Sequence, residues 1–399
     1  MSTLKVDNIR HNSATSDAIT MASDGTCTAK LTSIGGGGLS HRNMIINGAM
    51  MISQRGTSST GNLYQTIDRF RTSSGYIGSI NLTQSQQQLT SSDTPYSSGF
   101  RYFYRAALSG AGTVNANGYI GISQRLEAQD VAQSGWDYTS SSSNITIQFW
   151  FRCSTNQTFY MALTSQDGTS QSYVFPFTAT GNNTWTKITK TIPGAANVQF
   201  DLNNERGLTV SFTPWYGTDW TGSKAINQWS AYSGSAEYPD YASTWLTAGA
   251  STFDITGVQL EVGDTATSFE HRTYQEEILR CMRYYQQLTG NDRGYNGATG
   301  GSGSFKNPVI GIYNGPTDVR GIYYHMVPMR DEPSLTVLGA LTDFDLEPFD
   351  RAPAAISMQR PGVFQSTLLI QDSGSATAGQ ACELTIDQAA GGLAFSAEL

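Results

Sequence analysis

Aromatic side chains gather between residues 215 and 245, where their rings could bind the apolar faces of sugars. This stretch holds four of the seven tryptophans, and the candidate residues are Trp215, Tyr216, Trp220, Trp229, Tyr232, Tyr238, Tyr241 and Trp245. Sugar rings stack on indole and phenol faces, while amide and carboxylate groups bind their hydroxyls. The polar candidates for that second task are Asp219, Asn227, Gln228, Glu237 and Asp240. Alternatively, the aromatic residues anchor a long loop onto the protein or onto a neighbouring subunit.

A second group of aromatic residues lies near the C-terminus. It comprises Tyr295, Tyr313, Tyr323, Tyr324 and His325, and it follows a Gly- and Asn-rich segment at 290–303. Loops and distal surfaces are common places for binding sites. We therefore keep Tyr323 and Tyr324 as a rival glycan site, with ordinary packing of strands as the alternative.

Residues suited to catalysis are few. The four histidines, His11, His41, His271 and His325, have none of the spacings that metal sites use. A glycosidase needs two carboxylates across one bond, and the candidates are Glu237 with Asp240, or Asp343, Asp345 and Glu347. Such closely spaced acids are typical of surface loops. We therefore expect no catalytic residue, no bound metal, no cofactor and no enzymatic activity.

Composition and charge exclude several classes of protein. The 399-residue chain has a net charge of −8 and a pI near 5.0, which disfavours nucleic acid as a partner. No apolar run is long enough to span a membrane, and the first residues lack the apolar core of a signal peptide. We therefore expect no membrane insertion. The cysteines at 27, 153, 281 and 382 are far apart, and we expect reduced, mostly buried thiols.

Glycine-rich and aromatic-rich composition is typical of short strands joined by tight turns. The chain has 41 glycines and 11% aromatic residues. Alternating strand patterns recur at 144–152, 158–163, 172–177, 184–192, 208–212 and 253–262, with turn residues between them. This pattern predicts an antiparallel β-sandwich or jelly roll over 41–271.

The two ends of the chain read as separate units. Residues 1–40 carry thin apolar patches and end in a hinge of four glycines at 35–38, so they need a partner or further copies to bury a core. Residues 291–399 return to strand patterns and are long enough for a small second β-domain.

One segment, 272–290, departs from the strand pattern. Thr273 and Glu276 form a capping-box pattern, which predicts a helix running to about residue 288. A heptad stripe follows its spacing: Tyr274, Ile278, Cys281, Tyr285 and Leu288. The stripe predicts either helices meeting around a symmetry axis or a helix lying on its own sandwich.

Several segments resemble bacteriophage tail fibre proteins, particularly those of marine phages that infect cyanobacteria and their neighbours. The matching segments are Ser2–Asp7, Ala18–Thr26, Asn43–Met50, Ser53–Gly56, Asp68–Phe70, Gln124–Glu127, Ile145–Trp150, Gly257–Gly263, Ala266–Arg272, Cys281–Tyr285, Pro328–Pro333 and Ala397–Leu399. The stretch from Gln259 to Tyr285 is the most specific part. The resemblance covers about nine tenths of the chain.

This resemblance implies a homotrimeric virion fibre with a jelly roll similar to carbohydrate-binding modules. Residues 1–40 would attach it to phage tail or neck proteins, after assembly in the host cytoplasm. Its function would be adhesion to a bacterial surface polysaccharide. A structural neck, collar or tail adaptor is the first alternative, and a glycan depolymerase is the second.

One position departs from sugar-binding jelly rolls of this type. Those domains often hold calcium between an acid after the first strand and an Asp on the last strand. Here Ala49 and Met50 stand at the early position, and Asp254 lacks that partner. Calcium takes six to eight oxygen ligands, so we do not expect it to bind.

Overall fold

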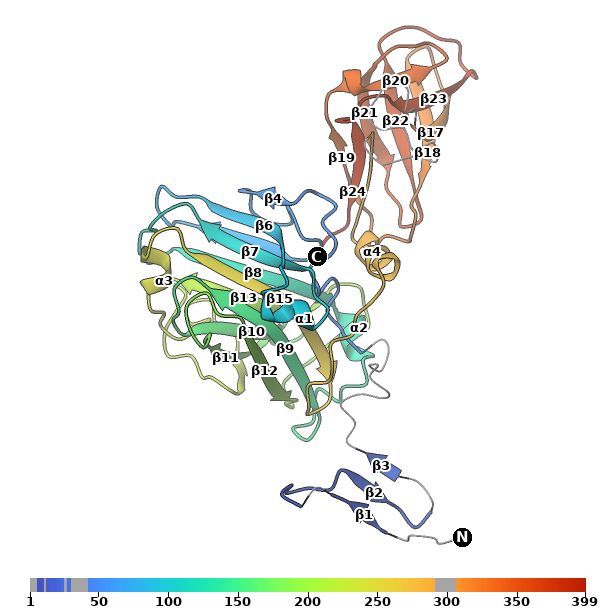
Figure 1. Ribbon diagram of the computed structural model, residues 1–399. Coiled ribbons are helices and arrows are strands. Elements are labelled where there is room, and N and C mark those ends of the chain that lie inside the picture. The colour runs from blue at the N-terminus through green and yellow to red at the C-terminus, as the bar shows by residue number, and fades with distance from the viewer. Residues whose placement is uncertain (1–5, 11, 25–26, 30–41, 291–305) are drawn as a thin grey trace.

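The computed structural model describes residues 6–10, 12–24, 27–29, 42–290 and 306–399. Figure 1 shows a large β-sandwich joined through a short helix to a smaller β-domain that carries the C-terminal strands. The four-glycine hinge and most of the 290–303 segment, including Tyr295, lie outside the described residues.

The N-terminal strands form a small sheet of their own. Its order is β1-β2-β3, with bounds β1 (Asn8–Ile9), β2 (Ile19–Met21) and β3 (Cys27–Ala29). Ile9 and Met21 are exposed, so this sheet does not bury its apolar side chains within the described residues. The prediction that this segment has no core of its own is consistent with that exposure.

The sandwich consists of two six-stranded antiparallel sheets. Sheet I has the order β14-β11-β10-β13-β8-β5, and sheet II has the order β12-β9-β15-β7-β6-β4. The strands of sheet I are β5 (Arg71–Gly75), β8 (Tyr119–Glu127), β10 (Phe159–Ser165), β11 (Gln171–Phe177), β13 (Arg206–Tyr216) and β14 (Trp229–Ala231). Those of sheet II are β4 (Ser58–Ser59), β6 (Leu82–Gln88), β7 (Tyr102–Leu108), β9 (Asn144–Cys153), β12 (Thr186–Pro193) and β15 (Thr252–Val262). The predicted mainly β sandwich is confirmed.

Strand alternation builds the core between these sheets. Phe149 and Phe151 of β9 meet Phe177 of β11 edge to face, with centroid distances of 5.3 and 5.0 Å. Phe159 and Phe253 pack edge to face beside them. Because alternate side chains point to opposite faces of a strand, the residues between these phenylalanines lie on the outer faces of the sandwich.

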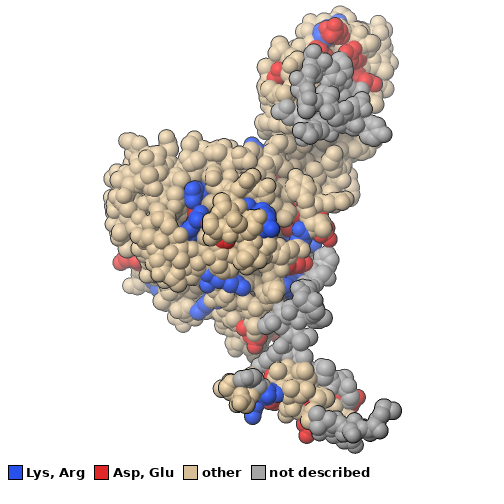
Figure 2. Space-filling model, viewed as in Figure 1, with Lys and Arg blue, Asp and Glu red and all other residues tan. Residues whose placement is uncertain are grey.

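Short helices join or cap the strands. They are α1 (Thr94–Ser97), α2 (Ala128–Ala132), α3 (Thr244–Thr247) and α4 (Tyr274–Met282). Figure 2 shows that charged side chains are sparse on the face in view, with basic residues gathered over the middle of the sandwich. There α1 lies over sheet II, where Arg152 pairs with Asp93 and Asp254.

Helix α4 is shorter than predicted. The Thr273–Glu276 capping box is present, but the helix ends at Met282, and Tyr285 and Leu288 lie in strand β16 (Tyr285–Thr289). Tyr285 pairs with Ser396, a partner 111 positions further along the chain. Pairing with so distant a strand outweighs the local heptad pattern, so the five-residue helical stripe was a wrong prediction.

The C-terminal domain contains two sheets. One has the order β16-β24-β19, and the other has the order β20-β23-β17-β18-β22-β21. Its other strands are β17 (Lys306–Tyr313), β18 (Asp318–Tyr324), β19 (Ser334–Leu338), β20 (Phe344–Glu347), β21 (Pro353–Arg360), β22 (Gln365–Asp372), β23 (Ala381–Ile386) and β24 (Gly392–Ser396), with a short 3-10 turn at Leu341–Asp343. Phe344, Leu384 and Phe395 lie in its core.

Candidate functional site

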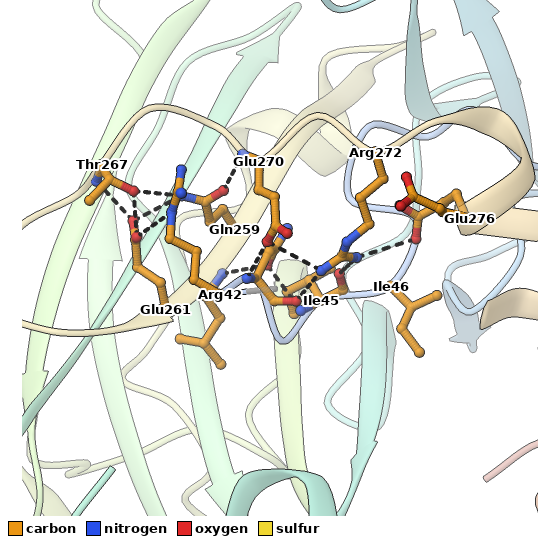
Figure 3. Close-up of polar contacts among 12 residues, drawn as sticks. Arg42, Ile45, Ile46, Gln259, Glu261, Thr267, Glu270, Arg272 and Glu276 are labelled. Carbon is orange, nitrogen blue, oxygen red and sulfur yellow. Dashed lines mark hydrogen bonds and ion pairs between the residues drawn. The ribbon is translucent and has the colours of Figure 1, made fainter. Parts of the chain in front are cut away.

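A buried polar network surrounds the segment that enters the sandwich at Arg42 (Figure 3). The Glu261 carboxylate accepts hydrogen bonds from Arg42 Nε at 3.1 Å and from Gln259 Nε2 at 2.9 Å. It also accepts one from the backbone N–H of Thr267 at 2.8 Å. Each oxygen of this buried carboxylate is therefore satisfied within the chain.

The same network continues toward helix α4. Glu270 accepts from the backbone N–H of Asn43 at 2.7 Å, and Arg272 donates to the Ile45 carbonyl at 3.1 Å. Arg272 also forms an ion pair with Glu277 at 3.5 Å. Figure 3 shows Glu270 and Arg272 pointing at one another between strand β15 and the segment that begins at Arg42. The residues of the most specific motif thus hold the fold together.

A second network joins the sandwich to the C-terminal domain. Arg69 is fully buried, with its guanidinium 3.4 Å from the centroid of the Tyr284 ring and ion-paired with Glu398. Arg55 pairs with the same Glu398 at 3.2 Å and lies 3.4 Å over the Tyr285 ring. One buried cluster of ion pairs therefore contains Arg55, Arg69 and Glu398, and we call this cluster the joint.

Glu127 forms the other half of the joint. Its carboxylate accepts two hydrogen bonds from Arg283, at 2.6 and 2.7 Å, and one from the Tyr284 hydroxyl at 2.6 Å. Although burial alone would raise the pKa of Glu127, these hydrogen bonds hold it below its usual value. Tyr284 therefore contacts Arg69 on its ring and Glu127 at its hydroxyl.

Asp254, the former calcium candidate, is enclosed by arginines. Arg105 binds both of its oxygens at 2.8 Å, and Arg152 binds one at 2.9 Å. Two guanidiniums on one carboxylate make a cation at that position electrostatically unfavourable. Among the described residues, no group of His, Cys, Asp or Glu side chains is arranged to hold a metal ion.

The aromatic cluster of residues 215–245 does not form one exposed platform. Trp215 and Tyr238 are buried, and Trp245 is buried in α3 with its indole N–H donating to the Thr252 carbonyl at 2.9 Å. Trp229 packs against the core and donates to the Pro193 carbonyl at 2.7 Å. In their present positions Trp215, Tyr238 and Trp245 cannot stack on a sugar, so these candidates take the anchoring role.

The remaining residues of the cluster lie over the outer face of sheet I. Tyr241 packs edge to face on Tyr160 at 5.0 Å and belongs with the buried layer. Tyr216 and Trp220 flank Tyr119 edge to face, at 6.3 and 6.2 Å. Of the eight residues predicted in this cluster, Tyr232 is the most exposed, at 42%.

Strand register defines what else this face carries. On β8, Ile120, Ile122 and Leu126 point into the core, so Tyr119, Gly121, Ser123 and Arg125 lie on the outer face. The Tyr119 ring lies against Gly75 of β5, where a Cβ would be 2.9 Å away. Glycine at position 75 therefore lets the aromatic ring lie flat across the sheet.

Hydroxyl side chains fill the middle of the face. Ser123 pairs with Ser211 of β13, and Thr209 pairs with Thr164 of β10. Thr164 in turn pairs with Ser172 of β11. Thr164 and Ser172 are buried, and so is the hydroxyl of Thr209, which leaves Ser73, Ser123 and Ser211 partly accessible. These three serines, with Tyr119, Tyr216 and Trp220 as the aromatic end, form what we call the polar face, a surface with rings for stacking and hydroxyls for hydrogen bonds.

Three arginines lie at the other end of the polar face. Arg71 pairs in register with Ser123, and Arg125 pairs with Thr209. Arg206 lies at the start of β13, close enough for its charge to act on Arg125. Partial burial, together with the charges of Arg71, Arg206 and Arg69, lowers the pKa of Arg125. Arg71 and Arg206 form no ion pair with a described residue, whereas Arg125 Nη1 lies 2.6 Å from the main-chain oxygen of Leu399, the last residue of the chain.

The carboxylates considered for catalysis are engaged elsewhere. Glu237 accepts from the Tyr232 hydroxyl at 2.8 Å, and Asp240 accepts from the Thr221 hydroxyl at 2.8 Å. Asp345 shares a hydrogen bond with Asp387, which raises its pKa to about 7. Carboxyls that contact each other directly lack the separation across a sugar bond that glycosidases use.

The rival C-terminal candidates divide into one buried and one exposed residue. Tyr323 is buried and stacked on Phe395 at 4.3 Å, whereas Tyr324 is 69% exposed. The Tyr313 hydroxyl donates to Asp372 at 2.5 Å inside the domain. Tyr324 is therefore the one member of this predicted pair that is available to a ligand.

An exposed apolar surface accompanies Tyr324. Ile310 of β17 pairs with Ile322 of β18, and Ile312 lies two residues further along β17. All three side chains are exposed on the outer side of their sheet, Ile310 at 67%. We call Ile310, Ile312, Ile322 and Tyr324 the apolar face.

The stripe predicted for self-association packs within its own chain. Cys281 is buried with Tyr284, Ile46 and Ile52, and Ile278 packs against the same cluster. Tyr274 is exposed, while Tyr285 and Leu288 belong to β16. The thiols of Cys153, Cys281 and Cys382 are free and buried, as expected, and burial raises the pKa of each.

A cavity of about 420 Å³ lies where α2 approaches the entering segment. Its lining includes Arg42, Asn43, Gln129, Asp130 and Arg280. Burial and the nearby Glu127 raise the pKa of Asp130.

No helix in the described part of the chain is long and apolar enough to cross a membrane.

Sequence reasoning missed the residues that complete the polar face. Tyr119, Arg71, Arg125 and Arg206 come from three different strands, and their juxtaposition depends on register. A local signal existed in the alternation of β8, where Tyr119, Ser123 and Arg125 occupy the positions opposite to the apolar ones. The alternation of β8 shows which of its side chains share a face, but it does not show which strands lie beside β8.

Comparison with known proteins gives distant structural likenesses. No protein-family model matches the chain, and no curated protein matches it. A CBM4 structure is similar over 54% of this chain and 98% of its own, with 11% identity and a TM-score of 0.28. The family 11 carbohydrate-binding module of a cellulosomal cellulase from Clostridium thermocellum covers 52% and 95%, with 11% identity and a TM-score of 0.26.

A phage protein is also similar. The enzymatically active domain of tailspike protein 4 of bacteriophage CBA120 matches 55% of this chain and 21% of its own, with 10% identity and a TM-score of 0.29. At such low TM-scores these likenesses define no function for this chain. Its sandwich architecture is established by the strand order and register described above.

Proposed function

We propose that this chain is a bacteriophage tail fibre that adheres to a bacterial surface glycan and does not cleave it. The observation that carries the proposal is the polar face, where Tyr119, Tyr216 and Trp220 lie at one end of a hydroxyl-lined sheet surface. Rings and hydroxyls in one surface suit the two kinds of contact that sugars make. The motif resemblance supplies the phage context.

Assembly on the virion is part of this proposal. Residues 1–40 would attach the fibre to tail or neck proteins, and the protein would assemble in the host cytoplasm. The exposed Ile9 and Met21 of the N-terminal sheet supply apolar surface for such a partner. Several copies on one particle would multiply a weak affinity for each glycan.

Self-association as a homotrimer is also proposed, through a surface other than the predicted helix. The apolar face of the C-terminal domain offers Ile310, Ile312 and Ile322 side by side. Contiguous apolar patches of this kind often mark protein–protein interfaces. A second copy of this chain is the occupant that a repeated fibre would provide.

The main alternative is a structural appendage that binds no receptor. Burial of Trp215, Tyr238 and Trp245 favours it, because aromatic residues used for packing are unavailable to a glycan. A depolymerase is less supported, since Glu237, Asp240 and Asp345 are each hydrogen-bonded within the chain.

The test is binding of the fluorescently labelled protein to bacterial strains, before and after their surface polysaccharide is removed. We expect saturable binding that the removal abolishes. Tyr232→Ser on the sandwich should weaken binding, whereas Tyr274→Ser, a matched change of an exposed tyrosine outside the polar and apolar faces, should not. Absence of binding to every strain, including a known host, would contradict adhesion, and loss only with Tyr324→Ser would move the site to the C-terminal domain.

A further inference from the structure

We propose that the polar face selects acidic polysaccharides, with Arg71, Arg125 and Arg206 binding the sulfate or carboxylate groups of the glycan. This inference rests on the proposed glycan binding and names the class of glycan. It deepens that function because the aromatic and hydroxyl groups alone would suit neutral sugars equally well.

Register places the three arginines together. Arg71 of β5 lies beside Ser123 of β8, and Arg125 lies two residues further along β8 on the same side. Arg206 at the start of β13 pairs with Glu127, which lies two residues beyond Arg125 on β8 and is itself bound by Arg283. Neighbouring and diagonal positions on one sheet face lie about 5 to 8 Å apart.

Hydrogen bonding leaves much of this positive charge uncompensated. Arg125 Nη1 donates to the Leu399 main-chain oxygen at 2.6 Å, and Arg206 Nη2 donates to Gln166 Oε1 at 2.7 Å. The Gln166 acceptor is an uncharged amide, whereas the Leu399 oxygen belongs to the carboxylate of the last residue, so the charge of Arg206 is uncompensated and that of Arg125 is not. Arg71 forms no hydrogen bond or ion pair with any described residue.

Other arginines of the chain have carboxylate partners. Arg42, Arg69, Arg105, Arg152, Arg272 and Arg283 all pair with carboxylates. Like charges held together repel and cost stability unless an anion compensates them. In a chain of net charge −8, two arginines on one outer face without a carboxylate partner among the described residues, Arg71 and Arg206, are therefore best explained by an external anion.

The position of the arginines relative to the aromatic end indicates that the anionic group belongs to a sugar. Tyr119 and Arg125 lie six residues apart on the same face of β8, which is about 20 Å of strand. The hydroxyls of Ser123 and Ser211 lie between them. A short acidic oligosaccharide would stack at one end, hydrogen-bond in the middle and pair with guanidiniums at the other end.

The experiment compares two polymers that share one backbone, dextran sulfate and dextran, with polyglutamate as a polyanion that lacks sugars. Affinity of the full chain is measured for each at low and physiological salt. We expect dextran sulfate to bind most tightly and to weaken as salt rises. Arg71→Gln should weaken it about tenfold, the loss expected for one charge-assisted hydrogen bond. Arg360→Gln, which alters an exposed arginine of the C-terminal domain outside the apolar face, is the matched control.

The outcomes separate this inference from the proposed function. Equal binding of dextran and dextran sulfate, or of polyglutamate and dextran sulfate, would overturn acidic-glycan selectivity. So would equal losses from Arg71→Gln and Arg360→Gln. If host cells bind through neutral polysaccharide alone, the proposed adhesion stands and this inference fails. If no polymer binds and no cell binds, the proposed function fails as well.

Discussion

Arg69 and Arg71 are two positions apart in sequence and have opposite environments. Arg69 is buried in the joint, where it contacts Glu398 and the Tyr284 ring. Arg71 lies on the polar face beside Ser123 and pairs with no described carboxylate. The difference separates two uses of the same side chain: a paired arginine holds domains together, and an unpaired one is available to a ligand.

The joint explains why several motifs that carry the tail fibre resemblance are rich in charged and aromatic residues. Asp68–Phe70, Gln124–Glu127 and Cys281–Tyr285 each supply a member of it: Arg69, Glu127 and Tyr284. Residues of a recognisable motif therefore need not be residues of a binding site. Of the polar face, only Arg125 lies in one of these three motifs, Gln124–Glu127.

The largest effect should come from breaking the joint. Arg69→Met leaves Glu398 with Arg55 as its remaining partner and removes the contact with the Tyr284 ring, and removing one member of a buried ion pair typically costs about 3 to 5 kcal/mol. We expect the free energy of unfolding to fall by that amount in chemical denaturation. Arg320→Met, at an exposed position, should change it by less than about 0.5 kcal/mol. Equal, small effects of the two variants would contradict the role of the joint.

The same comparison applies to apolar side chains, because those of the apolar face are exposed and lie outside the core of their domain. Ile310→Glu places a charge opposite Ile322 in the proposed contact between copies, and burying an unpaired charge is strongly unfavourable. Light scattering should then report a smaller assembly than for the unchanged protein. Ile226→Glu, at an exposed isoleucine of the sandwich, should leave the assembly intact. A monomeric unchanged protein would refute self-association outright.

Arg71→Gln tests the comparison with Arg69, because it should weaken glycan binding and leave the stability of the fold unchanged. Arg71 has no partner to lose among the described residues, so we expect the free energy of unfolding to change by less than about 0.5 kcal/mol. Binding to dextran sulfate should weaken about tenfold. A loss of stability comparable to that of Arg69→Met would show that both arginines serve the fold.

The smallest effect concerns two acids held together. The hydrogen bond with Asp387 raises the pKa of Asp345 from its usual 3.8 to about 7, so the folded protein retains a proton that the unfolded chain loses. Stability of the C-terminal domain should therefore be highest at low pH and decrease as pH rises from about 4 to 7. Calorimetry should show this decrease, and Asp345→Asn should flatten it. An identical slope in the variant would contradict a shared proton.

Local sequence patterns correctly predicted six of the twelve strands of the sandwich. Alternation identified β9, β10, β11, β12, β13 and β15, because one side of each strand faces the core. The capping box of Thr273 and Glu276 likewise placed the start of α4 correctly. Both signals depend on residues close together in sequence, which is why a single chain suffices to find them.

Features set by distant partners were not predictable in this way. The end of α4 depends on Tyr285 pairing with Ser396, and the burial of Trp215 and Trp245 depends on the opposite sheet. Composition marks aromatic residues but does not tell which side of a strand they occupy. The polar face required the register of β5, β8 and β13, which no local pattern reveals.

Hydroxyl-radical footprinting with and without dextran sulfate tests the central claim most directly, because it reports which side chains a glycan covers. The account predicts that Trp220 and Tyr232, over the polar face, become protected from oxidation, while the exposed Tyr324 and Phe364 of the C-terminal domain stay unchanged. Protection of Tyr324 and Phe364 with none at Trp220 and Tyr232 would contradict it.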